Sequence, residues 1–372
     1  MTARVLVTGG AGFIGSHVVD LLLQRGHAVR VYDALIPQVH GGAGPRYVSK
    51  DAELVVADIR DSEALKRALL GVDKVIHLAA EVGVGQSMYE VDRYVDVNSH
   101  GTAVLLQILS GGTTDVSRLV VASSMSIYGE GAYRCATHGV VSPRPRSAAA
   151  LHAREWEVRC PWCGAEVHPI PTPETKPLIP TSVYAVSKMD QEMLSLTVAE
   201  AYGIGAVALR IFNTYGPRQS LANPYTGVGA IFSSRLRNDR PPLVFEDGRQ
   251  LRDFVHVTDV ARAFAAALDA TTVSGVACNI GTGSPITIGE IARDLARVLG
   301  KQIEPQISRD FRVGDIRHCW ADTSLAWDLF GFSAKIPFSQ GVADLVGWAD
   351  HEVAVDHFDD AREELSAHGL SG

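Results

Sequence analysis

The sequence has little of what marks a membrane-spanning, secreted or nucleic-acid-binding protein. None of its apolar runs reaches the roughly 18 to 20 residues that cross a bilayer. Its opening residues, MTARVLVTGG, lack the apolar stretch and cleavage site of a signal peptide. No run of basic residues offsets the acidic excess, since 42 Asp and Glu stand against 34 Lys and Arg. We therefore expect a cytoplasmic protein that binds neither membranes nor nucleic acid.

Cysteine is also scarce, with 5 residues in a chain of 372. This small, odd number argues against a disulfide framework and favours buried thiols or metal ligands. Hydrophobic residues make up 46% and charged residues 20% of the chain, which excludes a disordered protein and allows a sizeable core. The length suits one large α/β unit or two domains.

Short apolar runs rich in β-branched residues alternate with helical periods over the first 130 residues. Helices are predicted near Ser16–Arg25 and Ser62–Leu70. This alternation is typical of βαβ units, so we predict an α/β fold with a Rossmann-type, doubly wound parallel sheet. The predicted strands are Arg4–Thr8, Ala28–Tyr32, Leu54–Ala57, Lys74–Leu78 and Leu119–Ala122.

The alternation divides the rest of the chain. It breaks over residues 131–180, which we interpret as an insertion, and resumes with a predicted helix over Val183–Tyr202. We therefore predict a Rossmann domain over residues 1–215, insertion included. A smaller C-terminal substrate-binding domain is expected over residues 216–345, and a helical acidic tail over 346–372.

A dinucleotide site is predicted where the first strand meets the first helix. Gly9, Gly12 and Gly15 form a G-x-x-G-x-x-G turn whose backbone can approach a pyrophosphate at the helix N-terminus. Asp33 closes the second strand, where a carboxylate binds ribose hydroxyls and repels a 2′-phosphate, which favours NAD over NADP. Asp58, after the third strand, suits the adenine rim.

A candidate catalytic group lies on the predicted helix over residues 183–202. Tyr184 and Lys188 are spaced i, i+4 and share one helix face. We expect the ammonium to lower the pKa of the phenol, so that the tyrosine can take a proton from a substrate hydroxyl. Ser124, after the fifth strand, can share a hydrogen bond with Tyr184 and the substrate oxygen.

The insertion contains two short pairs of metal-ligating residues. Cys135 and His138 form one pair, and Cys160 and Cys163 form the other. Together they predict a structural zinc site with three thiolates and one imidazole, shaped like a zinc knuckle. His152 and His168 are alternatives to His138, and exposed thiols without a metal are the competing interpretation.

Further motifs follow these sites in order. Together they resemble the extended short-chain dehydrogenase/reductases, specifically NAD-dependent nucleotide-sugar epimerases and dehydratases, over about residues 4–327. The motifs are GGAGFIG, HLAA (His77–Ala80), Asn98, SSMSIYG (Ser123–Gly129), YAVSK, RIFNTYGP (Arg210–Pro217) and LRDFVHVTD (Leu251–Asp259).

The resemblance implies a retained NAD, a nucleotide-diphosphate sugar as substrate and a homodimer built on helices near residues 99–109 and 183–202. It implies that Ser124, Tyr184 and Lys188 are catalytic. The implied cofactor site comprises Gly9, Gly12, Phe13, Ile14, Gly15, Asp33, Asp58, Ile59, Leu78, Ala79, Ala80, Asn98, Tyr184 and Lys188. The implied substrate site comprises Ser124, Ser126, Asn213, Arg252, Arg312 and Cys319.

Departures from the family pattern narrow the reaction. Sugar 4,6-dehydratases of this family carry an Asp-Glu pair where this chain has Met125 and Ser126, and related decarboxylases tend to carry Glu at 126. The expected reaction is 4-epimerisation through a 4-keto sugar, on a dTDP-6-deoxyhexose or a UDP-hexose. The insertion is similar to that of epimerases acting on dTDP-L-rhamnose. A 4-ketoreductase, a dehydratase-like enzyme and a non-enzymatic NAD-sensing regulator are the alternatives.

Overall fold

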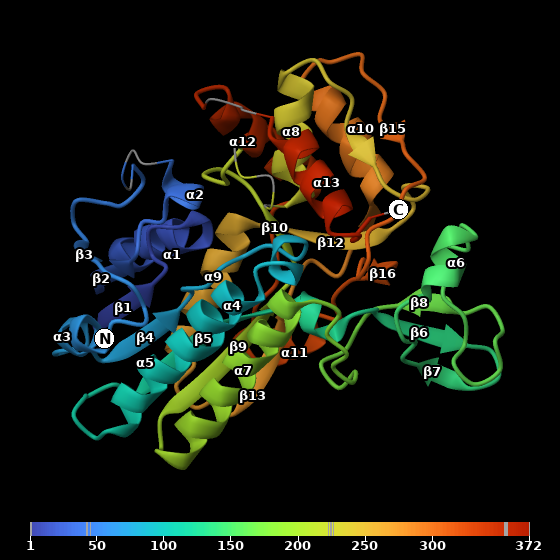
Figure 1. Ribbon diagram of the computed structural model, residues 1–372. Helices are drawn as coiled ribbons and strands as arrows, with labels where there is room; N and C mark the ends of the chain where they lie inside the picture. The colour runs from blue at the N-terminus through green and yellow to red at the C-terminus, as the bar shows by residue number, and fades with distance from the viewer. Residues whose placement is uncertain are drawn as a thin grey trace.

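The computed structural model describes residues 2–41, 44, 46–221, 223, 225, 227–352 and 356–371. Its centre is a parallel sheet of seven strands in the order β13-β9-β5-β4-β1-β2-β3 (Figure 1). The strands are β1 (Arg4–Thr8), β2 (Ala28–Asp33), β3 (Glu53–Val56), β4 (Lys74–His77), β5 (Arg118–Ser124), β9 (Gly205–Ile211) and β13 (Val276–Ile280). This confirms the predicted Rossmann-type α/β sheet.

Helices cover both faces of the sheet because its strands carry apolar side chains on both sides. In β1, Val5 and Val7 join the core under one face, whereas Leu6 joins the core under the other. The first face is covered by α1 (Phe13–Gln24), α9 (Val257–Asp269) and α11 (Ser324–Phe330). The second face is covered by α3 (Ser62–Ala68), α5 (Gly101–Ser110) and α7 (Val183–Ala201).

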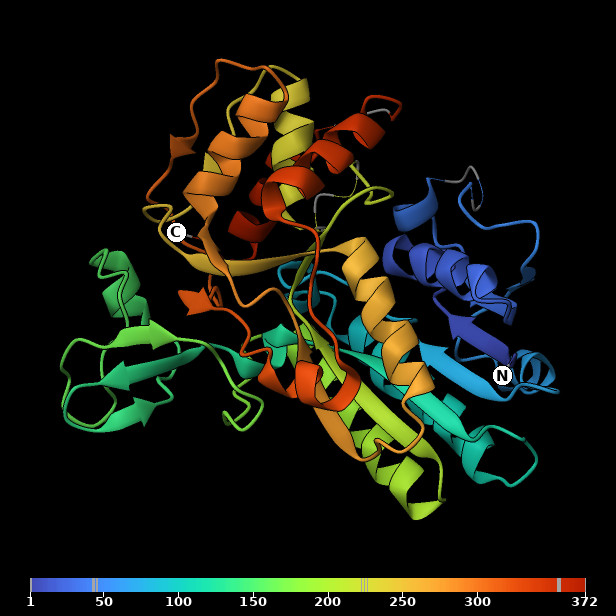
Figure 2. The ribbon, with the colours of Figure 1, turned by 180° about the vertical axis from the view of Figure 1, so that it is seen from behind.

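A smaller lobe stands over the carboxyl ends of the strands (Figures 1 and 2). Its own core joins Tyr215, Phe254, Leu295 and Leu345, which come from distant parts of the chain. Its helices are α8 (Val228–Arg237), α10 (Ile288–Val298), α12 (Phe338–Ala349) and α13 (Phe358–Ala367). Its strands are β10 (Asn213–Tyr215), β11 (Leu243–Val244), β12 (Leu251–His256), β14 (Pro285–Thr287), β15 (Gln306–Ile307) and β16 (His318–Cys319).

The predicted insertion is a separate small unit at the side of the molecule (Figures 1 and 2). It contains an antiparallel sheet in the order β7-β6-β8 and the short helix α6 (Ala148–His152). Its apolar core consists of only six buried residues, two of which are Cys135 and Cys160. Its strands are β6 (Ala132–Cys135), β7 (Gly139–Val141) and β8 (His168–Ile170).

Short helical segments connect the main elements near the cavity. They are α2 (Pro37–His40), η1 (Gln86–Met88), α4 (Val91–Tyr94), the π-helical η2 (Val95–His100) and η3 (Met125–Tyr128). Every helix in the described ranges is too short or too polar to traverse a bilayer.

The periodicity predicted a boundary between the two lobes at residue 215. In the structure, elements beyond residue 215 contribute to both lobes. Strand β13 and helix α9 come from residues beyond 215, yet β13 pairs with β9 at the edge of the main sheet and α9 packs on α1. Helix α12 also runs across the expected boundary at 345. Apolar periodicity identifies an element but does not say which of two cores the element joins.

Candidate active site

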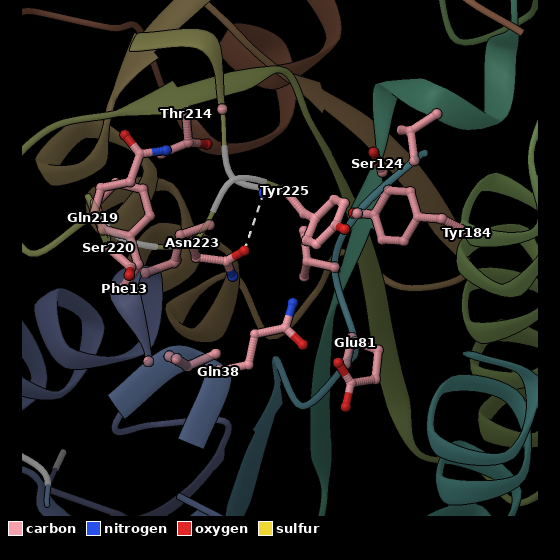
Figure 3. A pocket seen from close by; sticks show the side chains of 18 of the residues that line it. Phe13, Gln38, Glu81, Ser124, Tyr184, Thr214, Gln219, Ser220, Asn223 and Tyr225 are labelled. Carbon is pink, nitrogen blue, oxygen red and sulfur yellow. Dashed lines mark hydrogen bonds between the residues drawn. The ribbon is translucent and has the colours of Figure 1, made fainter. Parts of the chain in front are cut away.

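One cavity of about 1050 Å³ lies between the sheet and the smaller lobe. It brings together most residues of the predicted cofactor and substrate sites. Those that line it are Gly9, Gly12, Phe13, Ile14, Gly15, Asp33, Asp58, Ile59, Leu78, Ala79, Ala80, Ser124, Ser126, Tyr184, Lys188, Asn213, Arg252 and Arg312. Figure 3 shows part of this wall, with Phe13, Ser124 and Tyr184 labelled.

The turn between β1 and α1 is too tight for side chains at two of its glycines. This leaves the bare backbone that a dinucleotide pyrophosphate approaches. Gly9 has φ +68°, and a Cβ there would stand 2.8 Å from the backbone nitrogen of Ala79. A Cβ on Gly15 would lie 2.1 Å from the carbonyl oxygen of Gly9. The turn leads into α1 at the cavity wall, and its N-cap, Gly12, provides no side-chain cap for the first backbone N–H groups of the helix. A helix N-terminus of this kind can bind a phosphate.

The carboxylate of Asp33 is fixed at the end of β2. It accepts hydrogen bonds from the backbone nitrogens of Ala11 at 3.0 Å and Leu35 at 2.9 Å. Asp58 faces the same end of the cavity and pairs with Arg60, which lowers the pKa of the Asp58 carboxyl. Two carboxylates at this end of the cavity disfavour a further phosphate here, in keeping with NAD.

The proposed catalytic hydroxyls meet on the cavity wall. Ser182 caps α7 by accepting a hydrogen bond from Ala185, so the helix begins just before Tyr184. Tyr184 and Ser124, the last residue of β5, both line this wall and are both labelled in Figure 3. The Ser124 hydroxyl accepts a hydrogen bond from the hydroxyl of Ser126 at 2.9 Å.

The expected lowering of the Tyr184 pKa by Lys188 is wrong for the protein alone. Burial raises the pKa of Tyr184, and the side chain of Ser124 opposes the shift only in part. Burial also lowers the pKa of Lys188 to about 7, so much of this amine is uncharged at neutral pH. The Lys188 amine donates to Gln191 at 2.6 Å, one turn further along the helix. Sharing a helix face therefore does not make Lys188 a partner of the phenol here.

The other end of the cavity carries cationic and polar groups suited to a diphosphate. The Arg252 guanidinium is held by the carbonyls of Ile316 at 2.6 Å and Arg317 at 3.0 Å. Arg312 lies nearby and pairs with Asp315. Among the residues that the structure describes, the buried side-chain oxygen of Asn213 has no hydrogen-bond partner, which suits a ligand-binding group.

Two predicted site residues, Asn98 and Cys319, do not line the cavity of the described structure. Asn98, in η2, is fully buried, and its amide bonds the backbone of Glu81 and the hydroxyl of Ser187. It braces α7 and the loop after β4 rather than facing the cavity. Cys319 is also fully buried and packs with Met125 and Phe212. Met125 and Phe212 line the cavity, whereas Cys319 does not.

The four predicted metal ligands converge in the insertion. Their ligand atoms all lie within 4.8 Å of one another. The sulfurs of Cys135 and Cys163 are 3.8 Å apart, and His138 Nδ1 lies 3.7 Å from Cys135 Sγ and 3.5 Å from Cys160 Sγ. A tetrahedral site with metal–ligand bonds of about 2.0–2.3 Å has edges of about this length.

Comparison with known proteins decides the family. The model of the NAD-dependent epimerase/dehydratase family matches residues 5–159 and 160–281. The chain belongs to this family. A similar relative, the dTDP-L-rhamnose 4-epimerase of Burkholderia thailandensis, is 37% identical over 94% of this chain and 96% of its own.

Solved structures of UDP-glucose 4-epimerases are also similar. The UDP-glucose 4-epimerase of Thermotoga maritima, solved with UDP-glucose, has a TM-score of 0.77 and 30% identity, covering 93% of this chain and 98% of its own. That of Thermus thermophilus, solved with NAD, has a TM-score of 0.73 and 32% identity, covering 94% and 100%.

Two parts of the site were not predicted from the sequence. The side-chain oxygen of Gln191 accepts a hydrogen bond from the Lys188 amine. The i, i+3 spacing of the two residues would have indicated this contact. The expected acidic tail supplies α13, whose apolar side chains Phe358 and Leu365 line the cavity of this family member. Their spacing of seven residues marks a buried helix face, a signal that the surrounding acidic residues obscured.

Proposed function

We propose that this protein is an NAD-dependent nucleotide-sugar 4-epimerase. The observation that carries the proposal is that the hydroxyl residues Ser124 and Tyr184 line the same cavity as the glycine-rich turn and the arginines 252 and 312. A nucleotide sugar held by its diphosphate at the arginines would present its sugar ring to these hydroxyls, beside the dinucleotide.

The chemistry assigned to the chain is proton transfer at one sugar oxygen. The positive charge of bound NAD⁺ would offset the burial that raises the pKa of Tyr184. Tyr184 would then take the proton of the C4 hydroxyl, with Ser124 holding the same oxygen in place. Bound NAD⁺ supplies a reversible acceptor for the C4 hydride. Tyr184 would return the proton after the 4-keto sugar has turned its other face, so the complete cycle consumes no reductant.

Dehydration is the weaker alternative because it needs an acid and a base besides the tyrosine. The carboxylates that line the described part of the cavity each have a partner of their own. Asp33 is held by backbone N–H groups, Asp58 pairs with Arg60, Glu81 with Arg93, Asp315 with Arg312 and Glu352 with Arg46. Met125 and Ser126, at the sugar position, supply neither group.

A dTDP-6-deoxyhexose is the preferred substrate, and a UDP-hexose is the alternative. The similarity to the dTDP-L-rhamnose 4-epimerase extends over 94% of the chain and therefore includes the insertion. The thioether of Met125 gives the sugar end of the cavity an apolar surface. Such a surface suits the C5 methyl group of a 6-deoxy sugar better than a hydroxymethyl group.

Isomer exchange tests the function. Incubation with dTDP-L-rhamnose, UDP-glucose and UDP-galactose, without added cofactor, should convert at least one of them to its 4-epimer. A substrate deuterated at C4 should retain the label, because the same hydride returns. Dependence on added NADH or NADPH would instead indicate a reductase. Absence of turnover, in protein that retains NAD, would support the sensing regulator.

We further propose that the Cys/His cluster holds one structural zinc ion. The distances among Cys135, His138, Cys160 and Cys163 match a closed tetrahedral site, which leaves no position for a substrate. The six-residue core of the insertion is too small to stabilise it, so a metal would supply the missing free energy.

A homodimer is the proposed assembly. Apolar side chains are exposed along α4, η2 and α7, with Val91 48%, Val95 43% and Met193 56% exposed. Val186 and Met193 are seven residues apart and therefore lie on one face of α7. A second copy of the chain, related by a twofold axis, would cover this face.

Introducing a charge on this face should separate the subunits. Met193→Glu is expected to convert a sedimenting dimer to a monomer, because the carboxylate would be buried without a partner. Leu70→Glu, on an exposed leucine that follows α3, is the matched control and should leave the dimer intact. A wild-type protein that sediments as a monomer would refute the assembly.

A further inference from the structure

The segment from Arg312 to Asp322 determines the positions of Arg252 and Arg312, the two arginines proposed to bind the diphosphate. It contains Arg312 itself, and its carbonyls at Ile316 and Arg317 hold Arg252. The Nη1 group of Arg252 donates to the carbonyls of Leu251 and Arg317, and Nη2 donates once to that of Ile316. Among the described residues, the bonds to carbonyls therefore leave Nε–H and one Nη2–H, the edge that binds a phosphate in bidentate fashion.

The insertion holds this same segment along its length. The backbone nitrogen of Gly131 donates to the carbonyl of His318 at 2.9 Å, and that of Thr172 donates to the carbonyl of Trp320 at 2.8 Å. The guanidinium of Arg146, whose side chain is 3% exposed, donates to the carbonyl of Asp315 at 3.0 Å. Three separate points of the insertion thus fix the backbone beside the two arginines.

An ion network crosses the interface between the insertion and the smaller lobe. Its centre is Arg317, whose side chain is fully buried. From the insertion, Glu157 accepts from Arg317 at 2.6 Å and contacts His318 at 3.1 Å. From the smaller lobe, Glu246 and Asp247 accept from Arg317 at 3.0 and 2.6 Å. A buried guanidinium requires such partners, so the loss of one should shift the backbone of residues 312–322.

We propose that the insertion is a positioning module for the nucleotide diphosphate, acting through Glu157 and Arg317. By fixing the carbonyls of Ile316 and Arg317, it sets the free edge of Arg252 toward the phosphates. The proposal rests on the proposed function, because it takes a nucleoside diphosphate as the bound group. Glu157 and Arg317 are positioning residues, since neither lines the cavity in the described structure.

Binding of dTDP and UDP, measured by titration calorimetry, tests the module without turnover. Glu157→Gln keeps the size of the side chain but removes its charge, and should raise the Kd of the nucleotide that binds by about tenfold. The KM of the sugar nucleotide should rise similarly, while kcat and the content of bound NAD stay within about twofold. Glu155→Gln is the matched control, since Glu155 is exposed on the same insertion and, within the described ranges, is bonded only through its backbone.

Asp247→Asn weakens the same network from the smaller lobe and should shift the Kd in the same direction. It decides the question if Glu157→Gln does not fold. An unchanged Kd in a folded variant, with the wild type binding normally, would overturn the positioning role alone. A wild-type protein that bound neither dTDP nor UDP would overturn the proposed function as well.

Discussion

Replacing Tyr184 by phenylalanine is expected to lower kcat by about a thousandfold, within the 10²–10⁴ range of general acid–base catalysis. The substitution removes the hydroxyl that would move the C4 proton and leaves the ring in place. Tyr184→Phe changes only this hydroxyl, so the fold and bound NAD should be retained. Isomer exchange at saturating substrate measures the effect.

Tyr202→Phe is the matched control for this experiment. Tyr202 ends the same helix, α7, and is 60% exposed. The control should exchange isomers at the wild-type rate. A Tyr184→Phe protein whose kcat stayed within about threefold of the wild type would remove the phenol from the mechanism.

Loss of the metal ligands is expected to have the second largest effect. Structural zinc contributes about 10–16 kcal/mol of apparent binding free energy in zinc-finger peptides. A Cys135→Ser, Cys160→Ser double variant should therefore lose its zinc, and the insertion should become open to proteolysis within residues 131–180. Metal analysis should find about one zinc per wild-type chain and none per variant.

Comparing His138→Gln with His168→Gln tests whether the histidine of the cluster is a metal ligand. His138 belongs to the cluster, whereas His168 is exposed on β8 and lies outside it. Only His138→Gln should lower the zinc content. Purified wild-type protein with less than half an equivalent of zinc would contradict the metal assignment.

The fold was largely predictable because its strands are continuous apolar runs and its first turn has little freedom. The pattern of Val5, Leu6 and Val7 suits a strand buried on both faces, and a side chain at Gly9 or Gly15 would collide with backbone. Such local constraints can be read without knowledge of the tertiary structure.

Other features depended on distant packing and could not be predicted in the same way. Asn98 and Cys319 belong to recognisable motifs, but the depth of each side chain depends on neighbours such as Ser187 and Met125. The pKa of Tyr184 is dominated by burial, which the i, i+4 spacing to Lys188 does not reveal. The acidic composition of α13 likewise concealed its apolar face.

The place of β13 in the main sheet has a consequence for work with fragments. A recombinant piece ending near residue 215 would contain every glycine of the cofactor turn, yet its strand β9 would have an open edge where β13 normally pairs. Such edges recruit strands from other molecules, so the piece should aggregate on expression. An autonomous cofactor-binding fragment would have to extend at least to Ile280.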